Sequence, residues 1–289
     1  MATSPASRDL RAPSRPRSAP RVDASTGLTA LVALLAAAAA ITGLLADGLY
    51  RDNASTAAGW RANDLVTLLA LPLLAGAYAH ARRGSPRGRL VWLGVLWYLV
   101  YNYAFYLVGT ALNDVFLLYA ALVAAGMWAL GVGLAGTDVG GIARRLRPTA
   151  PARWVAGYLA LAAVGLAGAW TAQSLAFALD GTVPQIMLDT DSKTPIVFAL
   201  DLTLVVPTML VAAGLLWRRR AWGHVLGTIV GVKGVLYACV LLAMAADQAN
   251  RGEDDAWSFA PVSAFLLLGC LFVATCLLRD VRDRPRAPS

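Results

Sequence analysis

Eight apolar runs, each long enough to cross a lipid bilayer, constrain the fold of this chain more than any other feature. They cover residues 28–46, 64–81, 90–110, 113–134, 154–179, 195–217, 222–245 and 258–278. About 20 apolar residues in a helix span the hydrocarbon core, and only helices and closed barrels satisfy their backbone groups there. The runs therefore predict an all-α, polytopic integral membrane protein with eight transmembrane helices. The second run is the shortest and the least clearly marked.

The composition agrees with this class. Hydrophobic residues make up 58% of the chain and charged residues 15%, whereas a soluble domain carries about a quarter charged residues. The net charge of +8 is spread over alternate loops and does not gather on one face. That distribution is typical of membrane topology and argues against a nucleic-acid partner. The lipid bilayer is the partner that the sequence predicts.

The basic residues predict the orientation. The N-terminal tail, the loops around 82–89 and 144–153, the turn 218–220 and the C-terminus carry 20 of the 25 Lys and Arg residues. By the positive-inside rule both termini are cytoplasmic, and an even number of spans places them on one side. We therefore expect a bacterial plasma (inner) membrane protein. It would consist of a disordered basic tail at 1–26, a transmembrane domain at 27–279 and a short basic tail at 280–289.

The opposite side is rich in acidic residues, and three polar residues there mark the starts of predicted spans: Asp64, Asn113 and Asp114. Asp64 and Asp114 are expected to cap helix N-termini, where a carboxylate meets free N–H groups. With Asn113 they would line an outer mouth that concentrates cations. The alternative is that short polar loops simply use aspartate.

Similar stretches in the two halves of the chain suggest a four-plus-four internal repeat with parallel halves. Ala62-Asn63-Asp64-Leu65 resembles Ala199-Leu200-Asp201-Leu202, and a proline and a cluster of arginines follow each. Matched, proline-interrupted helices in two halves are typical of transporter binding sites. Apolar helices also resemble one another by composition alone, so the repeat stays a hypothesis.

Lys233 lies near the middle of an otherwise apolar run, where a charge costs about 2.5–3.5 kcal/mol or more. At 1.5 Å per residue, Asp201 lies ~9 Å, Asn102 ~12 Å and Lys233 ~15–18 Å below the outer ends of their spans. The three side chains are therefore expected to share a layer, in which Lys233 and Asp201 form an ion pair.

Tyrosines surround this predicted polar layer. Tyr98, Asn102 and Tyr106 are four residues apart and share a helix face, with Tyr101 beside them, and Tyr237 follows Lys233 by four. Hydroxyls and an amide can satisfy a buried charge or bind a solute. For the tyrosines near the outer end the alternative is an interfacial aromatic belt.

Catalytic and nucleotide-binding motifs are missing from the sequence. There is no P-loop, GxSxG or HExxH pattern, and the three cysteines form no CxxC, so no cofactor is predicted. The leading hypothesis is a transporter or solute-binding membrane protein that is not driven by ATP and handles a small solute or a proton. The alternatives are a structural or accessory membrane subunit and, third, an intramembrane enzyme.

Overall fold

The computed structural model describes residues 23–147, 151–252, 257 and 260–282. Every regular element in these residues is helical, and eight spans are long and apolar enough to cross a membrane. The elements are α1 Ala24–Leu45, α2 Ala54–Arg82, α3 Pro86–Gly109, α4 Phe116–Ala135, α5 Val139–Arg145, α6 Ala152–Asp180, α7 Gln185–Asp189, α8 Ile196–Leu200, the π-helical turn η1 Asp201–Val205, α9 Val206–Trp217, α10 Ala221–Asn250 and α11 Ala260–Asp280. The predicted all-α class and the number of spans are confirmed.

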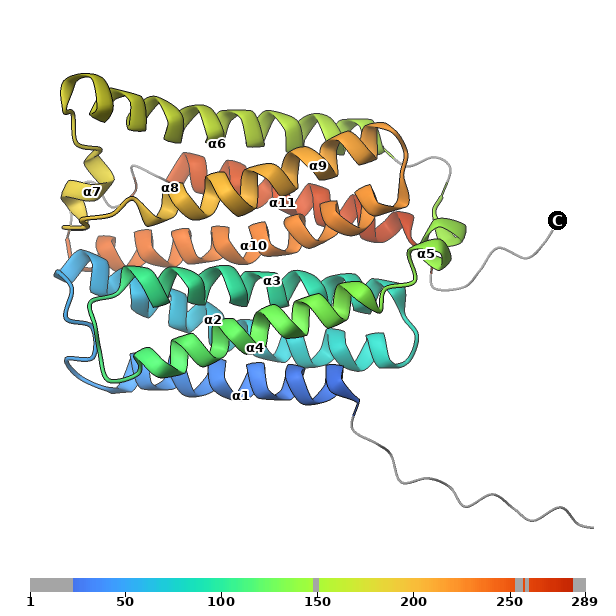
Figure 1. Ribbon diagram of the computed structural model, residues 1–289, viewed down its shortest axis with the longest axis horizontal. Helices are drawn as coiled ribbons and strands as arrows, with labels where there is room; N and C mark the ends of the chain where they lie inside the picture. The colour runs from blue at the N-terminus through green and yellow to red at the C-terminus, as the bar shows by residue number, and fades with distance from the viewer. Residues whose placement is uncertain (1–22, 148–150, 253–256, 258–259, 283–289) are drawn as a thin grey trace, which may run out of the picture.

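The eight spans form two groups of four helices (Figure 1). In the N-terminal group each of α1, α2, α3 and α4 packs on the next, and α4 closes on α1. In the C-terminal group α6, the α8–η1–α9 stack, α10 and α11 pack in the same cyclic order. The groups meet where α10 packs against α2 and α3, and both ends of the described chain lie at one end of the bundle.

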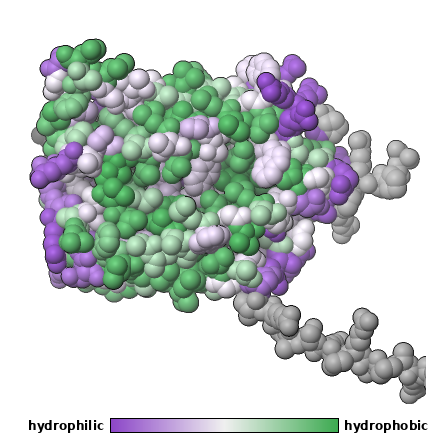
Figure 2. All heavy atoms as spheres, viewed as in Figure 1, coloured by the Kyte–Doolittle hydropathy of each residue, from purple (hydrophilic) through white to green (hydrophobic). Residues whose placement is uncertain are grey.

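Helix α3 is the most buried span. Leu96, Leu99 and Tyr103 on it are fully buried, while large apolar side chains such as Leu34 and Trp154 elsewhere are 70% and 78% exposed. On the face seen in Figure 2, apolar side chains cover the middle of the molecule and hydrophilic residues lie at its two ends. This surface matches a bilayer, since a membrane protein keeps its polar groups inside or at the two interfaces.

The expected start of the second span was wrong. Helix α2 begins at Ala54, ten residues before Asp64, and Asn53 caps it by accepting a hydrogen bond from the N–H of Thr56 at 2.8 Å. Residues 54–63 are too polar to be recognised as a span, yet Trp60 and Asn63 are buried there. Packing against neighbouring helices stabilises this polar segment as a helix. Hydropathy does not measure such packing.

Glycines allow the central helices to approach closely. A Cβ atom at Gly94 on α3 would lie 2.5 Å from the Cβ of Val232 on α10, and one at Gly231 would lie 3.0 Å from the backbone nitrogen of Ala274 on α11. Real Cβ atoms essentially never come nearer than 3.0 Å. The small-residue face of α10 is therefore a packing surface, as in other membrane helix pairs.

The two prolines behave differently. Helix α2 continues without interruption through Pro72, whereas the π-helical turn η1 directly precedes α9, in which Pro207 is the second residue. In a π turn the backbone bonds run from residue i+5 to residue i, and such turns are frequent at functional sites. Among the described spans, the π-helical backbone thus occurs in one.

The end of the bundle that holds both ends of the described chain is tied together by backbone bonds. Leu146, after α5, and Val281, after α11, form an isolated β-bridge. The N–H of Arg147 donates to the carbonyl of Asp280, and the N–H of Arg282 donates to that of Arg145, both at 3.0 Å. The predicted tails fall largely at 1–22 and 283–289, outside the described residues.

Candidate functional site

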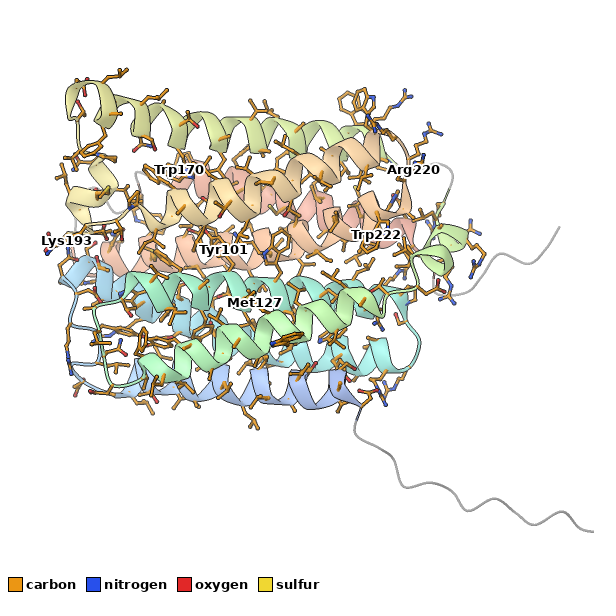
Figure 3. All side chains as sticks on the ribbon, in the orientation of Figure 1. Tyr101, Met127, Trp170, Lys193, Arg220 and Trp222 are labelled. Atoms are coloured by element: carbon orange, nitrogen blue, oxygen red, sulfur yellow. The ribbon has the colours of Figure 1, made fainter. Side chains whose placement is uncertain are left out.

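Asp201 is the first residue of η1 and is 5% exposed. The Tyr101 hydroxyl donates to its Oδ1 at 2.8 Å, and the indole N–H of Trp170 donates to its Oδ2 at 3.0 Å. The donors come from α3 and α6, so three spans meet at one carboxylate. Figure 3 shows Tyr101 and Trp170 between Lys193 at one end of the bundle and Arg220 at the other.

The local backbone explains why Asp201 takes this position. Its carbonyl accepts the N–H of Val206, the i+5 bond of the π turn, and Pro207 has no N–H to offer the preceding turn. The partner Trp170 is itself held by stacking on Phe198 of α8, with 4.2 Å between ring centroids and 19° between planes. The carboxylate and its indole donor are therefore both positioned by the α8–η1 segment.

Lys233 lies beside this group, 5% exposed. Its ammonium nitrogen is 3.6 Å from the centroid of the Tyr101 ring and 4.4 Å from that of Tyr237, and the two rings meet edge-on at 5.5 Å. Cation–π contacts contribute about 2 kcal/mol or more when the cation is removed from water. Tyr101 thus contacts the cation with its ring and the anion with its hydroxyl.

The predicted contact between Lys233 and Asp201 takes an indirect form. Within the part of the chain that the structure describes, no carboxylate oxygen lies within 4.0 Å of the Lys233 nitrogen. Tyr101 bridges the two instead. We call Asp201, Tyr101, Trp170, Lys233 and Tyr237 the bridged site. It keeps charges of both signs inside the bundle without direct contact between them.

A second buried carboxylate occupies the N-terminal group. Asp64 is fully buried, and it accepts hydrogen bonds from the hydroxyls of Tyr50 at 2.5 Å and Tyr106 at 3.0 Å. A Cβ at Gly43 would lie 2.0 Å from Asp64 Oδ2, so only glycine in α1 allows this approach. Burial and the Asp64 carboxylate both raise the pKa of Tyr50, which lies in the connection before α2, so its hydroxyl stays protonated and donates.

Asp64 is therefore not a helix cap and does not line an outer mouth. It lies ten residues inside α2, ~15 Å from the start of the helix, because the helix begins earlier than the hydropathy predicted. Of the other two residues predicted for the mouth, Asp114 lies at the surface, whereas Asn113 is buried and only 7% exposed. Asp114 has an 83% exposed side chain 3.4 Å from Arg51, and Asn113 is a turn residue that accepts the N–H of Val115 at 3.1 Å.

The tyrosine stripe of α3 divides between the two carboxylates. Tyr106 reaches Asp64, and the amide of Asn102 donates to the Thr67 hydroxyl of α2 at 3.4 Å, so both face the N-terminal group. Tyr98 is fully buried, and its hydroxyl has no hydrogen-bond partner among the described residues. Only Tyr101 reaches Asp201. The predicted single layer is therefore two sites on either side of α3.

Two residues of these sites could not be recognised in the sequence. Trp170 lies in an apolar run that contains no ionisable residue between Arg153 and Asp180 apart from Tyr158, and Tyr50 lies in a connecting loop. Each is a hydrogen-bond donor with a largely apolar body, which suits a buried acceptor. The sequence indicates only that a carboxylate inside an apolar run needs a hydrogen-bond donor. It does not indicate which residue supplies that donor.

Comparison of the chain with protein-family models, with curated proteins and with solved structures finds no match. The chemistry of the sites therefore has to be judged from their geometry. Both carboxylates accept only neutral donors among the contacts described here, and the lysine rests on ring faces. Such groups can exchange a proton or hold a charged solute, because no salt bridge has to be broken first.

Proposed function

We propose that this chain is an integral protein of the bacterial plasma membrane that transports or binds a small solute or a proton without ATP chemistry of its own. The bridged site is its working centre. The observation that carries this proposal is that Lys233 and Asp201 are both buried yet joined only through Tyr101. Ionisable residues kept inside membrane helices generally mark ion or solute pathways.

The absence of a direct ion pair between Lys233 and Asp201 favours a functional role for these residues over a purely structural one. A buried ion pair is stabilised by close contact and by hydrogen bonds to every remaining group. Here a neutral aromatic residue separates the charges, so each can gain or lose a proton, or meet a charged solute group, without breaking the other's contacts. The π turn at Asp201 adds a segment of irregular backbone at the same place, as in transporters with interrupted helices.

The proposal includes an orientation and an internal relationship. Both termini lie in the cytoplasm, because the arginine-rich helix ends gather at the end of the bundle where the described chain starts and ends. The two halves descend from a duplicated four-helix unit. Supporting this, each half closes in the same helix order and holds one carboxylate that accepts hydrogen bonds from two aromatic donors.

One observation favours the second candidate, a structural or accessory subunit. Asp201 accepts bonds from two other spans, so the same contacts would lock α3, α6 and η1 together. In that case the site would stabilise the fold and have no turnover of its own.

Proton flux separates the two candidates. The purified protein is reconstituted into vesicles that contain a pH-sensitive dye, and a potassium diffusion potential drives protons across the membrane. We expect flux through the wild type and its loss in Asp201→Asn and Lys233→Met. Matched controls are Asp47→Asn and Lys193→Met, which change exposed residues of the same types.

Thermal melts of the same preparations show whether a lost flux reflects unfolding. Equal flux in wild type and both site variants would refute the working centre. No flux in the wild type would refute the proton as the transported species and favour the accessory role.

A further inference from the structure

Three successive hydrogen-bond contacts connect Tyr50, Asp64, Tyr106 and the backbone of α2. The Tyr50 hydroxyl oxygen lies 2.5 Å from Asp64 Oδ2, and Asp64 Oδ1 lies 3.0 Å from the Tyr106 hydroxyl oxygen. That same Tyr106 oxygen lies 2.6 Å from the carbonyl oxygen of Trp60. Asp64 and Tyr106 are both fully buried, so these groups form their hydrogen bonds with one another.

Each of the three contacts needs one hydrogen, and the number of hydrogens depends on the charge of Asp64. A tyrosine hydroxyl has one hydrogen, whereas a carboxylate and a carbonyl have none. With Asp64 ionised, the two tyrosines supply two hydrogens for three contacts, so Tyr106 donates either to Asp64 or to the Trp60 carbonyl. With a proton on Oδ1, Asp64 donates to Tyr106, which donates to Trp60, and Tyr50 donates to Oδ2. The protonated acid therefore satisfies all three contacts at once.

The surroundings of Asp64 bring no cation to its carboxyl group. Within the part of the chain that the structure describes, no Lys, Arg or His nitrogen lies within 4.0 Å of it. On the adjoining helix α10, Lys233 rests on the tyrosine rings of the bridged site, and Arg61 on α2 itself is exposed. A buried carboxylate without a counter-charge becomes neutral by binding a proton.

The titratable side chains that do interact with Asp64 are all tyrosines. Helix α1 has no ionisable residue and α4 has only Tyr119. Asp52, in the same connection as Tyr50, accepts the indole N–H of Trp60 at 3.0 Å and the backbone N–H of Ala111 at 3.1 Å instead. The interacting set is Tyr50, Tyr98, Tyr103, Tyr106 and Tyr119. A phenol ordinarily has a pKa of about 10, so a proton that this cluster exchanges near neutral pH belongs to Asp64.

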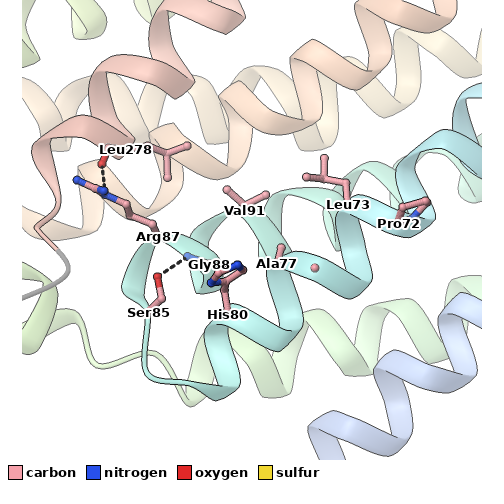
Figure 4. A pocket seen from close by; sticks show the side chains of 10 residues that line it. Pro72, Leu73, Ala77, His80, Ser85, Arg87, Gly88, Val91 and Leu278 are labelled. Atoms are coloured by element: carbon pink, nitrogen blue, oxygen red, sulfur yellow. Dashed lines mark hydrogen bonds between the residues drawn. The ribbon is translucent and has the colours of Figure 1, made fainter.

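Tyr50 connects Asp64 to the surface of the protein. It lies in the connection between α1 and α2, at the end of the bundle opposite the two ends of the described chain, and is 9% exposed. The cleft on α2 that Figure 4 shows does not reach the carboxyl group. Its lining on this helix begins at Pro72, eight residues or ~12 Å beyond Asp64.

We propose that Asp64 is a second proton-binding site, separate from the bridged site, whose bound proton lies on Oδ1 and is donated to Tyr106. Uptake of a proton from water forms one O–H bond at Oδ1, and no group is oxidised or reduced. On release, Tyr106 turns its hydrogen from the Trp60 carbonyl to Asp64. Proton binding therefore changes how α3 contacts α2.

Infrared spectroscopy of the protein in vesicles detects this proton directly, because a protonated carboxyl group has a carbonyl stretch that a carboxylate lacks. At neutral pH we expect a band in the wild type that Asp64→Asn removes. The matched control is Asp47→Asn, which changes an exposed aspartate and should leave the band unchanged. Asp201→Asn should also leave it unchanged, because the proton is not in the bridged site. Raising the pH while the protein stays folded should remove the band reversibly.

Tyr106→Phe is a second variant that keeps Asp64 and the ring beside it. The Asp64 band should shift to higher wavenumber, because its proton loses the acceptor, whereas Tyr103→Phe should not shift it, since the Tyr103 hydroxyl lies 3.3 Å from the Ala36 carbonyl. If a folded Asp64→Asn protein retains the band, the proposal is wrong. If Asp64→Asn does not fold, an unshifted band in Tyr106→Phe refutes it. A band lost in Asp201→Asn alone would place the proton in the bridged site, and a band that does not respond to pH would exclude reversible binding.

Discussion

Tyr101→Phe tests the bridged site with the smallest chemical change that the structure offers. The substitution removes the hydroxyl that donates to Asp201 at 2.8 Å and keeps the ring that lies 3.6 Å from the Lys233 nitrogen. Asp201 Oδ1 then loses a donor in a site that is 5% exposed. The anion loses its bridge while the cation keeps its ring contact.

The magnitude follows from the kind of bond that is lost. A hydrogen bond to a charged group contributes about 1.5–3 kcal/mol in soluble proteins, but measured couplings between membrane helices average about 0.6 and reach about 1.7 kcal/mol. The short distance and the burial of Asp201 place this bond in the upper part of the membrane range. We expect a coupling above ~1 kcal/mol, which lowers Tm by about 2–4 °C per kcal/mol.

The assay is a double-mutant cycle of Tyr101→Phe and Asp201→Ala, followed by thermal or denaturant unfolding in detergent. Tyr101→Phe should destabilise the wild type and have little effect once the carboxylate is gone. Tyr103→Phe is the control, because its hydroxyl lies 3.3 Å from the Ala36 carbonyl and does not touch Asp201. If Tyr101→Phe has the same effect in both backgrounds, the two losses are additive and the hydroxyl does not stabilise Asp201.

Three further predictions concern the Lys233–Asp201 coupling, the packing around Asp64 and the membrane topology. Lys233→Met and Asp201→Asn should each lower Tm, because removing one of two opposite buried charges leaves the other uncompensated. The double variant should recover part of the loss. Additive losses in Tm would show that the two residues are not coupled. Gly43→Ala should destabilise the protein by about 1–3 kcal/mol through overpacking against Asp64. Gly214→Ala should not, because a Cβ there meets nothing within 4 Å. Equal Tm values for the two variants would refute the close approach of α1 to Asp64. Cysteines placed at Gln185 and Gly140 should react with an impermeant thiol reagent on intact cells at the first position only, because arginines surround the second; labelling at Gly140 would reverse the orientation.

The number of spans could be predicted because bilayer thickness sets a length that apolar runs must reach. The start of α2 could not, because residues 54–63 are held in the helix by a cap and by tertiary packing around Trp60. A hydropathy pattern reports the solvent that a segment faces. It does not report the neighbours that a polar segment buries itself against.

The sites were predictable as residue types but not as contacts. Lys233, Asp201 and Tyr101 were recognisable because ionisable and hydroxyl groups are rare in apolar runs. Helix rise alone also placed Asn102 in their layer, but depth does not give the direction in which a side chain points. Asn102 and Tyr101 are adjacent in sequence, so they lie ~100° apart around α3 and face different helix groups.

The use of α3 by both carboxylates has a consequence for the independence of the two halves. Tyr106 serves Asp64 and Tyr101 serves Asp201, and five positions separate them, which is ~7.5 Å along the axis and ~140° around it. A rotation or slide of this single helix would change both contacts together, so we expect an event at one carboxylate to alter the free energy of the other, and the reverse equally. A chain cut after α5 would leave the second half with its aspartate but without Tyr101. A separately expressed second half would therefore have its complete site only after it reassembles with the first half, which carries Tyr101.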